Sequence, residues 1–122
     1  MPNEKSTKYD LEERTALFGE NLIAFLRAIK ETTLNKPLLI QLIRSGTSIG
    51  ANYCEADGAE SKKDFQHKVG ICKKEAKETK YWIRMLSLLH PEKKEALRIL
   101  WKEAQELTLI FSKILISSRE RQ

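Results

Sequence analysis

The segment Arg44–Leu86, RSGTSIGANYCEADGAESKKDFQHKVGICKKEAKETKYWIRML, joins a helical half crowded with small residues to a basic helical half. The small residues of its first half are Ser45, Gly46, Thr47, Ser48, Gly50, Ala51 and Asn52. Because glycine costs a helix about 1 kcal/mol relative to alanine, this run indicates close packing between backbones. Gly46 and Gly50 are four residues apart and so lie on one helix face. We therefore expect a neighbouring helix to approach closely along this face.

The second half of the segment predicts one long helix, from about Lys62 to Leu89. Ser61 and Asp64 have the spacing of a helix-capping box at its start. Mostly apolar side chains then recur in alternating steps of four and three residues, which is typical of helices in bundles and coiled coils. These positions are Phe65, Val69, Cys72, Ala76, Thr79, Ile83 and Leu86. His90 precedes a proline and so avoids the helical region, which should end the helix.

Three further helices are predicted from periodic apolar positions. They run from Asp10 to about Thr33, from about Pro37 to Ala56 and from about Glu92 to Ser118. Pro37 suits the first turn of its helix, and Gly58 can end that helix in a left-handed conformation. The core-facing side chains of the last helix should be Leu97, Trp101, Ala104, Thr108, Phe111 and Leu115.

The links between these helices are short, which makes consecutive helices antiparallel neighbours. We therefore predict an all-α fold, an antiparallel up-down-up-down four-helix bundle, in a single domain over residues 9–118. Residues 1–8 and 119–122 are expected to be flexible tails. A chain of 122 residues buries enough surface to fold without a disulfide.

The cysteines and the hydropathy pattern predict a cytoplasmic protein. Cys54 and Cys72 each fall inside a helical pattern and are not closely spaced, so we expect both to be buried thiols. No run approaches the roughly 18 apolar residues that cross a bilayer. The polar start MPNEKSTKYD also lacks the apolar core of a signal peptide. No membrane association is expected.

The net charge of +5 is concentrated in the third helix. Residues 61–90 carry eight Lys or Arg against three Asp or Glu, whereas residues 1–34 and 35–60 are each slightly acidic. The cationic strip on this helix consists of Lys63, Lys73, Lys77, Lys80 and Arg84, with Lys62 and Lys74 beside it. A basic helix is a candidate for contact with a phosphate backbone. The alternative is a strip that is solvated, or paired with acidic residues of another subunit.

The same helix has a second apolar strip, about a quarter-turn or more from its core-facing side chains. It consists of Ile71, Trp82, Met85 and Leu89. A single bundle buries one face of a helix well, so this strip is a candidate subunit interface. The alternative is a wide core that absorbs both faces.

Motifs for enzyme chemistry, cofactors and metals are sparse in this chain. It has no glycine-rich phosphate loop after a strand. A di-iron bundle needs two Glu-x-x-His pairs, whereas Asp64 and His67 form one Asp-x-x-His, with His67 directed away from the core. We therefore predict no catalytic activity, no cofactor and no metal. One weaker alternative is a ribonuclease, because the spacing of Arg84 and His90 resembles that of the HEPN helical ribonucleases. Met85 departs from that pattern, which has a polar residue after the arginine.

The words RSGTSIGAN, ESKKDF and KEAKETKYWIRML, with Glu55 and Ala56, resemble the bacterial four helix bundle protein family, also called the 23S rRNA intervening-sequence protein family. The segment that contains them, residues 44–86, is about a third of the chain, and the first and last helices match in pattern only. The resemblance implies a left-handed four-helix bundle that assembles into a ring-shaped homopentamer without known catalytic activity. The family name records a genomic location within ribosomal RNA genes. It does not itself show RNA binding.

A related type of member is similar to the accessory protein of diversity-generating retroelements, a basic pentamer that engages reverse transcriptase and nucleic acid. On these grounds we expect an oligomeric scaffold whose basic strip binds RNA or DNA, with a protein such as a reverse transcriptase as a further candidate partner. In a ring, modest contacts would be strengthened by multivalency. The main alternative is an assembly module for protein partners that binds no nucleic acid.

Overall fold

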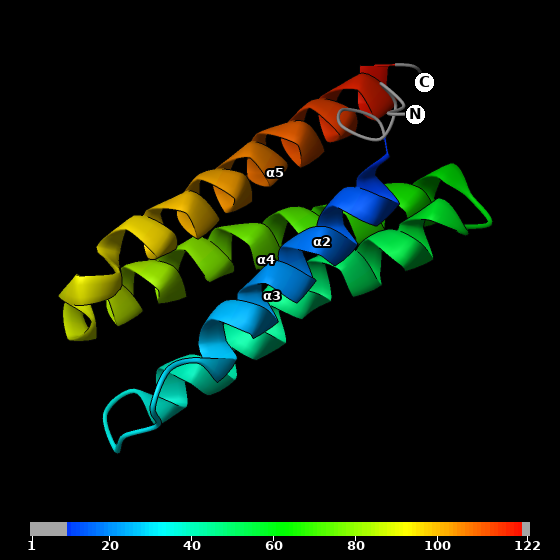
Figure 1. The fold of residues 1–122 in the computed structure, drawn as a ribbon. Helices are drawn as coiled ribbons and strands as arrows, with labels where there is room; N and C mark the ends of the chain where they lie inside the picture. The colour runs from blue at the N-terminus through cyan, green and yellow to red at the C-terminus, as the bar shows by residue number, and fades with distance from the viewer. Residues whose placement is uncertain (1–9, 121–122) are drawn as a thin grey trace, which may run out of the picture.

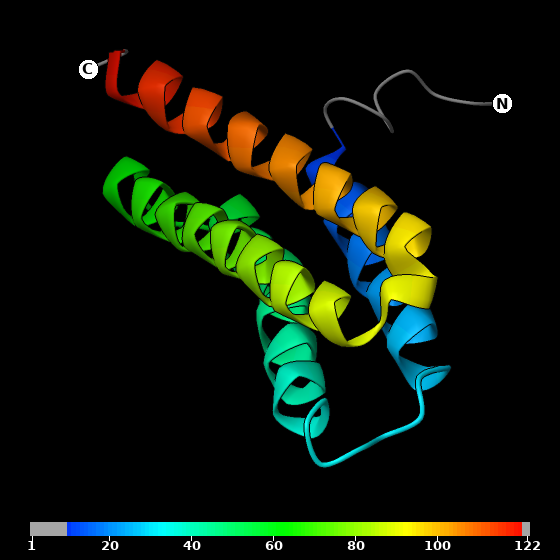
Figure 2. The ribbon, with the colours of Figure 1, turned by 90° about the vertical axis from the view of Figure 1, so that its left-hand side faces the viewer.

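The computed structural model describes residues 10–120, which form four α-helices joined by short connections (Figures 1 and 2). The helices are α2 (Leu11–Arg27), α3 (Lys36–Asp57), α4 (Lys62–Leu89) and α5 (Lys94–Glu120), and a 3₁₀ turn, η1 (Pro91–Lys93), precedes α5. Each helix packs against the next, and α2 also contacts α5. The predicted all-α four-helix bundle is therefore confirmed. No helix within residues 10–120 is long and apolar enough to cross a membrane.

The first helix is shorter than predicted, because α2 ends at Arg27 rather than near Thr33. Side chains of the following loop replace the helical hydrogen bonds. The Thr32 backbone N–H donates to Asn35 Oδ1 at 2.7 Å, and the Asn35 N–H donates to Thr32 Oγ1 at 3.1 Å. Short polar side chains that bond the backbone in this way compete with helix formation.

Two other predicted ends are also corrected. Gly58 ends α3, but its φ is −99°, so it does not adopt the left-handed conformation. The last helix begins as the 3₁₀ turn η1 and continues to Glu120, so Arg119 and Glu120 are helical rather than part of a flexible tail. The start and end of α4 are as predicted, with Ser61 Oγ accepting the Asp64 N–H at 3.0 Å and His90 following the last helical residue. The predicted tails 1–8 and 121–122 lie outside the described residues.

The glycines of α3 face α2, as the small-residue run predicts. A Cβ atom on Gly46 would lie 2.1 Å from Leu22 Cδ2, and one on Gly50 would lie 3.2 Å from Thr15 Oγ1. Leu22 and Thr15 are both buried, so they have little room to move. The absence of side chains at Gly46 and Gly50 therefore allows α2 and α3 to pack closely.

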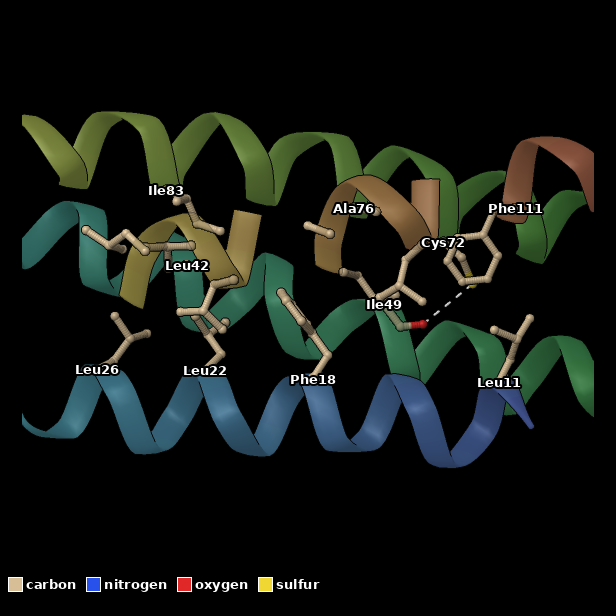
Figure 3. Close-up of a cluster of buried hydrophobic side chains, with 14 of the residues drawn as sticks. Leu11, Phe18, Leu22, Leu26, Leu42, Ile49, Cys72, Ala76, Ile83 and Phe111 are labelled. Atoms are coloured by element: carbon tan, nitrogen blue, oxygen red, sulfur yellow. Dashed lines mark hydrogen bonds between the residues drawn. The ribbon is translucent and has the colours of Figure 1, made fainter. Parts of the chain in front are cut away.

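The core lies between all four helices and is mostly aliphatic (Figure 3). Phe18 and Leu22 of α2 point toward the side chains of the other helices, and Phe111 of α5 is fully buried. Polar groups on the α3–α4 side of the core satisfy one another. Thr79 Oγ1 donates to Ser45 Oγ at 2.9 Å, and the Cys72 thiol lies 3.5 Å from the carbonyl oxygen of Ile49.

Two side chains predicted to be buried lie at the surface. Cys54 is exposed on α3, whereas Cys72 is buried, and both are free thiols. Trp101 retains 38% of its surface, although it falls in the same four-and-three rhythm as the buried Leu97 and Ala104. Its position on the edge of α5 next to α4 explains the difference, because an edge position on a helix contacts one neighbour rather than the core.

Candidate functional site

Cationic side chains of α4 and α5 gather along the line where the two helices meet, which we call the basic seam. On α4, Lys73, Lys77, Lys80 and Arg84 follow in steps of four, three and four residues and so share one edge of the helix. Direct contacts with α5 place Lys80 on that edge. The basic seam comprises Lys62, Lys73, Lys77, Lys80 and Arg84 of α4 and Lys94, Arg98 and Lys113 of α5.

Lys80 is the member of the basic seam that is held most firmly. Its Nζ donates a short hydrogen bond to Gln105 Oε1 of α5. The same ammonium lies 5.3 Å from the ring centroid of Trp101, within the range of a cation–π interaction. Lys80 therefore links α4 to α5 as well as contributing charge.

A shallow groove occurs near each end of the basic seam. The groove beside η1, of about 270 Å³, is lined by Arg84 and Ser87 of α4 and by Lys94, Arg98 and Trp101 of α5. The groove at the other end, of about 600 Å³, has Lys62 and Lys113 around Phe65 and Ile114. Both grooves combine positive charge with apolar or aromatic surface.

Most cations of the basic seam have no acidic partner in the part of the chain that the structure describes. Lys73, Lys77 and Arg84 form no ion pair with any residue between 10 and 120. In contrast, Lys68 on the α3 side of α4 pairs with Glu55 at 2.6 Å, and this hydrogen bond is the main cause of its raised pKa. Arg98 forms an ion pair with Glu95, with 2.6 Å between Arg98 Nη2 and Glu95 Oε2. The basic seam is thus an edge of uncompensated positive charge.

Two predicted cations lie elsewhere. Lys63 and Lys74 are exposed, and their helical positions place them about a quarter-turn from the basic seam, on the outer face of α4. Lys74 is close enough to Glu78 to help lower the pKa of that carboxyl group. The seven predicted contacts therefore divide into five on the seam and two outside it.

The second apolar strip of α4 is only partly covered by its own subunit. Ile71, Trp82 and Met85 are half-buried, and Leu89 retains 37% of its surface. The Trp82 ring packs against the core, and its indole N–H donates to Glu78 Oε2 at 3.1 Å. Apolar surface thus remains available at the α3-facing edge of α4, away from the basic seam.

An ion-pair cluster fixes the α3–α4 contact next to this strip. Arg44 of α3 donates to Glu78 Oε2 at 2.5 Å and to Glu75 Oε1 at 3.4 Å. The hydrogen bond to Glu78 is the main cause of the raised pKa of Arg44. The pKa of Glu78 is lowered, first by the Trp82 indole N–H and then by Arg44. Glu75 is buried, so Arg44 supplies the charge partner that a buried carboxylate needs.

Arg84 and His90, the two residues of the ribonuclease alternative, lie in different surroundings. Arg84 lines the groove beside η1. His90 Nε2 lies 3.2 Å from Asn35 Nδ2, which is a donor, so Nε2 accepts and the ring proton resides on Nδ1. That nitrogen lies 3.1 Å from Glu92 Oε2. Both ring nitrogens of His90 therefore bind protein groups, and the ring ties α4 to the α2–α3 connection.

The opposite side of the bundle has an acidic groove between α2 and α3, of about 570 Å³. Its carboxylates are Asp10, Glu12, Glu13 and Glu20 of α2 and its N-cap. The exposed Cys54 also lines it. Within residues 10–120, no group of three or more His, Cys, Asp or Glu side chains is arranged to hold a metal ion.

Comparison with protein families identifies the chain. The model of the 23S rRNA-intervening sequence protein family matches residues 18–113. The chain belongs to this family. A crystal structure of a protein with unknown function from the S23 ribosomal protein family of Bacteroides thetaiotaomicron has the same fold, with a TM-score of 0.76 and 30% sequence identity. The alignment covers 85% of this chain and 96% of that one. No curated protein matches the chain.

In this member of the 23S rRNA-intervening sequence protein family, the contribution of α5 was missing from the sequence prediction. Lys94, Arg98, Trp101 and Gln105 follow in steps of four, three and four residues, the same rhythm as Lys73 to Arg84 on α4. That repetition was the available signal, because two antiparallel helices with matching polar edges can align them along one seam. Trp101 obscured it, since a tryptophan in an apolar rhythm is expected in the core.

Proposed function

We propose that this protein is a non-enzymatic helical scaffold that binds the phosphate backbone of RNA or DNA along the basic seam. The observation that supports it is the row of Lys73, Lys77 and Arg84, none of which has a charge partner between residues 10 and 120. An α-helix advances about 1.5 Å per residue, so these three residues extend over roughly 16 Å of the seam. That length matches several phosphates of one strand, whose spacing is a few ångströms.

Assembly of several copies belongs to the same proposal. The partly covered strip Ile71, Trp82, Met85 and Leu89 is the proposed contact between copies, and the family resemblance suggests five of them. Because this strip and the basic seam lie on different edges of α4, a copy bound at the strip would leave the seam open to nucleic acid. Repetition of the seam would raise the overall affinity through multivalency.

The test compares two double substitutions on one helix. Lys73→Glu with Lys77→Glu removes charge from the seam, and the matched control Lys63→Glu with Lys74→Glu makes the same change on the outer face. Binding of labelled oligonucleotides is measured by fluorescence anisotropy between about 50 and 200 mM salt. We expect the seam variant to bind at least tenfold more weakly, with a salt slope lower by about 1.4 to 1.8, and the control variant to bind almost normally.

Equal binding by the wild type and the seam variant would refute the proposal, as would the absence of any binding by the wild type. Circular dichroism and mass measurement of both variants establish that the fold and assembly persist. Intact structured RNA after incubation with either the wild type or His90→Ala would agree with a non-enzymatic role. Cleavage that is lost in His90→Ala would instead support the ribonuclease alternative.

The acidic groove favours one alternative function, an assembly module that binds no nucleic acid. Its carboxylates are opposite in charge to the basic seam, and the two surfaces lie on opposite sides of one subunit, so the groove of one copy would complement the seam of the next. In that case the seam would be covered in the oligomer. The measured mass would fall as salt is raised, because salt screens such contacts.

A further inference from the structure

We propose that Trp101 is a stacking platform for an unpaired base, so that the basic seam prefers single-stranded nucleic acid to duplex. This inference rests on the proposed function and specifies its substrate class. It concerns the groove beside η1, where Arg84 and Lys94 approach Trp101 from the two helices of the seam.

The two tryptophans of the chain differ in their burial and in their hydrogen bonding. The Trp82 indole N–H donates to Glu78, and its ring packs against the core. No hydrogen bond joins the indole N–H of Trp101 to another residue within 10–120. Trp101 retains 38% of its surface, although it adjoins a buried helix face. Trp101 therefore has both an accessible aromatic surface and a free donor.

The surroundings of Trp101 hold the ring in place and attract anions. Lys80 lies over the ring and is itself anchored by Gln105, which limits movement of the indole. Arg84, Lys94 and Arg98 line the same groove, and within residues 10–120 only Arg98 of these three has an ion-pair partner, Glu95. A flat aromatic surface beside several cations is the combination that binds a base together with its phosphate.

The size and chemistry of the groove favour one nucleotide of a single strand. Its volume of about 270 Å³ is near the lower limit of small-ligand pockets. Ser87 Oγ donates to the carbonyl oxygen of Ile83, which leaves the hydroxyl oxygen free to accept from a base or a sugar. In a duplex the faces of the bases are stacked on one another and cannot reach Trp101 without unpairing.

The experiment uses Trp82→Phe, which leaves Trp101 as the only tryptophan of the chain. Its fluorescence is followed while a single-stranded oligonucleotide, or a duplex of the same length, is added. We expect quenching by the single strand and little change with the duplex. Trp101→Leu should weaken single-strand binding roughly tenfold while leaving the salt slope and the duplex affinity unchanged. Trp101→Phe, which keeps an aromatic ring, should retain most of the affinity.

The outcomes separate the two proposals. If Lys73→Glu with Lys77→Glu weakens binding but Trp101→Leu does not, the stacking inference fails and the phosphate-binding proposal stands. Equal losses for single strand and duplex in Trp101→Leu would also overturn stacking, because the tryptophan would then support the groove rather than a base. If no oligonucleotide binds the wild type, both proposals fail. Thermal unfolding of Trp101→Leu and Trp101→Phe verifies that each variant is folded.

Discussion

The α2–α3 side and the α4–α5 side of the bundle are built from opposite kinds of side chain. Between α2 and α3, Gly46 and Gly50 remove side chains from the contact, and carboxylates surround the groove above it. Between α4 and α5, long cationic side chains extend along the contact, and one of them, Lys80, lies 5.3 Å from the centroid of the Trp101 ring. The first side joins backbones closely, and the second holds its charges at the surface.

This difference predicts that the two sides respond differently to substitution. Close packing at glycines tolerates little change, because a single added methyl group meets a buried neighbour. Flexible lysines and arginines at a helix edge tolerate change in shape, since their charged ends reach water or a ligand. Substitutions on the α2–α3 side should therefore affect stability first, and substitutions on the α4–α5 side should affect binding first.

The largest expected effect is a difference in reaction rate between the two cysteine thiols. Cys54 reports on access to the acidic groove, and Cys72 reports on access to the core. Burial raises the pKa of Cys72 to about 12, so near pH 8 only about one such thiol in ten thousand is ionised. We expect a thiol-disulfide reagent to modify the exposed Cys54 at least roughly a thousandfold faster than Cys72. Cys54→Ser should remove the fast phase. Two thiols of equal rate in the folded protein would contradict the structure.

The raised pKa of Cys72 also predicts how stability depends on alkaline pH. The unfolded chain loses this proton near the ordinary pKa of 9.0, whereas the folded chain keeps it until about pH 12. The folded state therefore binds more protons in this window, and the free energy of unfolding should fall as pH rises through it. Urea titrations at several pH values measure this dependence. In Cys72→Ala the free energy of unfolding should fall less steeply with pH than in the wild type.

The next largest effect is on the free energy of unfolding, which an alanine should lower at one glycine and raise at another. Gly46→Ala should lower the free energy of unfolding by about 1 to 3 kcal/mol, because its Cβ would overlap the buried Leu22. Gly70→Ala, the matched control in α4, meets no atom within 4 Å and should raise it by about 0.5 to 1 kcal/mol through helix propensity. Urea unfolding measures both. A stabilised Gly46→Ala protein would show that the α2–α3 contact is looser than described.

A smaller effect is expected for Arg44→Met. This change removes the charge partner of Glu75 and Glu78 at the α3–α4 contact, which joins the α2–α3 side of the bundle to the α4–α5 side. Near pH 7 the free energy of unfolding should fall by about 1 to 2 kcal/mol. The lowered pKa of Glu78 contributes stability above its ordinary 4.5, and this contribution is lost as pH falls through the lowered value. The difference between wild type and variant should therefore shrink in acid.

The control for that prediction is Arg98→Met, which breaks the exposed pair with Glu95. Ion pairs at the surface contribute little, so this change should leave the free energy of unfolding almost unchanged. Equal losses in Arg44→Met and Arg98→Met would mean that the α3–α4 cluster gains nothing from the burial of Glu75.

The smallest effect is expected for Glu12→Gln with Glu20→Gln in the acidic groove. If nucleic acid binds only the opposite side, the affinity should stay the same or rise by up to about twofold, because long-range repulsion is reduced. Fluorescence anisotropy measures the affinity, and mass measurement of the same variant reports assembly. A smaller oligomer would favour the alternative in which this groove receives the basic seam of another copy.

The elements that could be predicted are those with a local cause. The start of α4 follows from Ser61, which accepts the Asp64 N–H, and its end follows from His90 before a proline. The end of α2 could not be predicted in this way, because Ile29 continues the apolar rhythm while Asn35 and Thr32 take over the backbone hydrogen bonds. Such competition depends on the path of the loop.

The candidate site likewise has features that could be predicted from the sequence and features that could not. The row Lys73, Lys77, Lys80 and Arg84 is visible as a helix edge, since helical spacing alone aligns it. Which neighbour borders that edge depends on packing, so the contributions of Lys94 and Arg98 appear only when α5 is placed. Trp101 shows the limit most clearly. Its rhythm predicts burial, whereas the structure leaves it at the surface, on the edge of α5 beside α4.

The amino-acid sequence by itself determined that the chain forms four amphipathic helices, that consecutive helices are antiparallel and that the third helix carries the excess positive charge. Periodicity, link length and composition are properties of the chain alone. The tertiary structure decided which charges remain unpaired and which aromatic ring stays accessible. These properties depend on distances between helices, and no spacing along one helix contains the position of its neighbour.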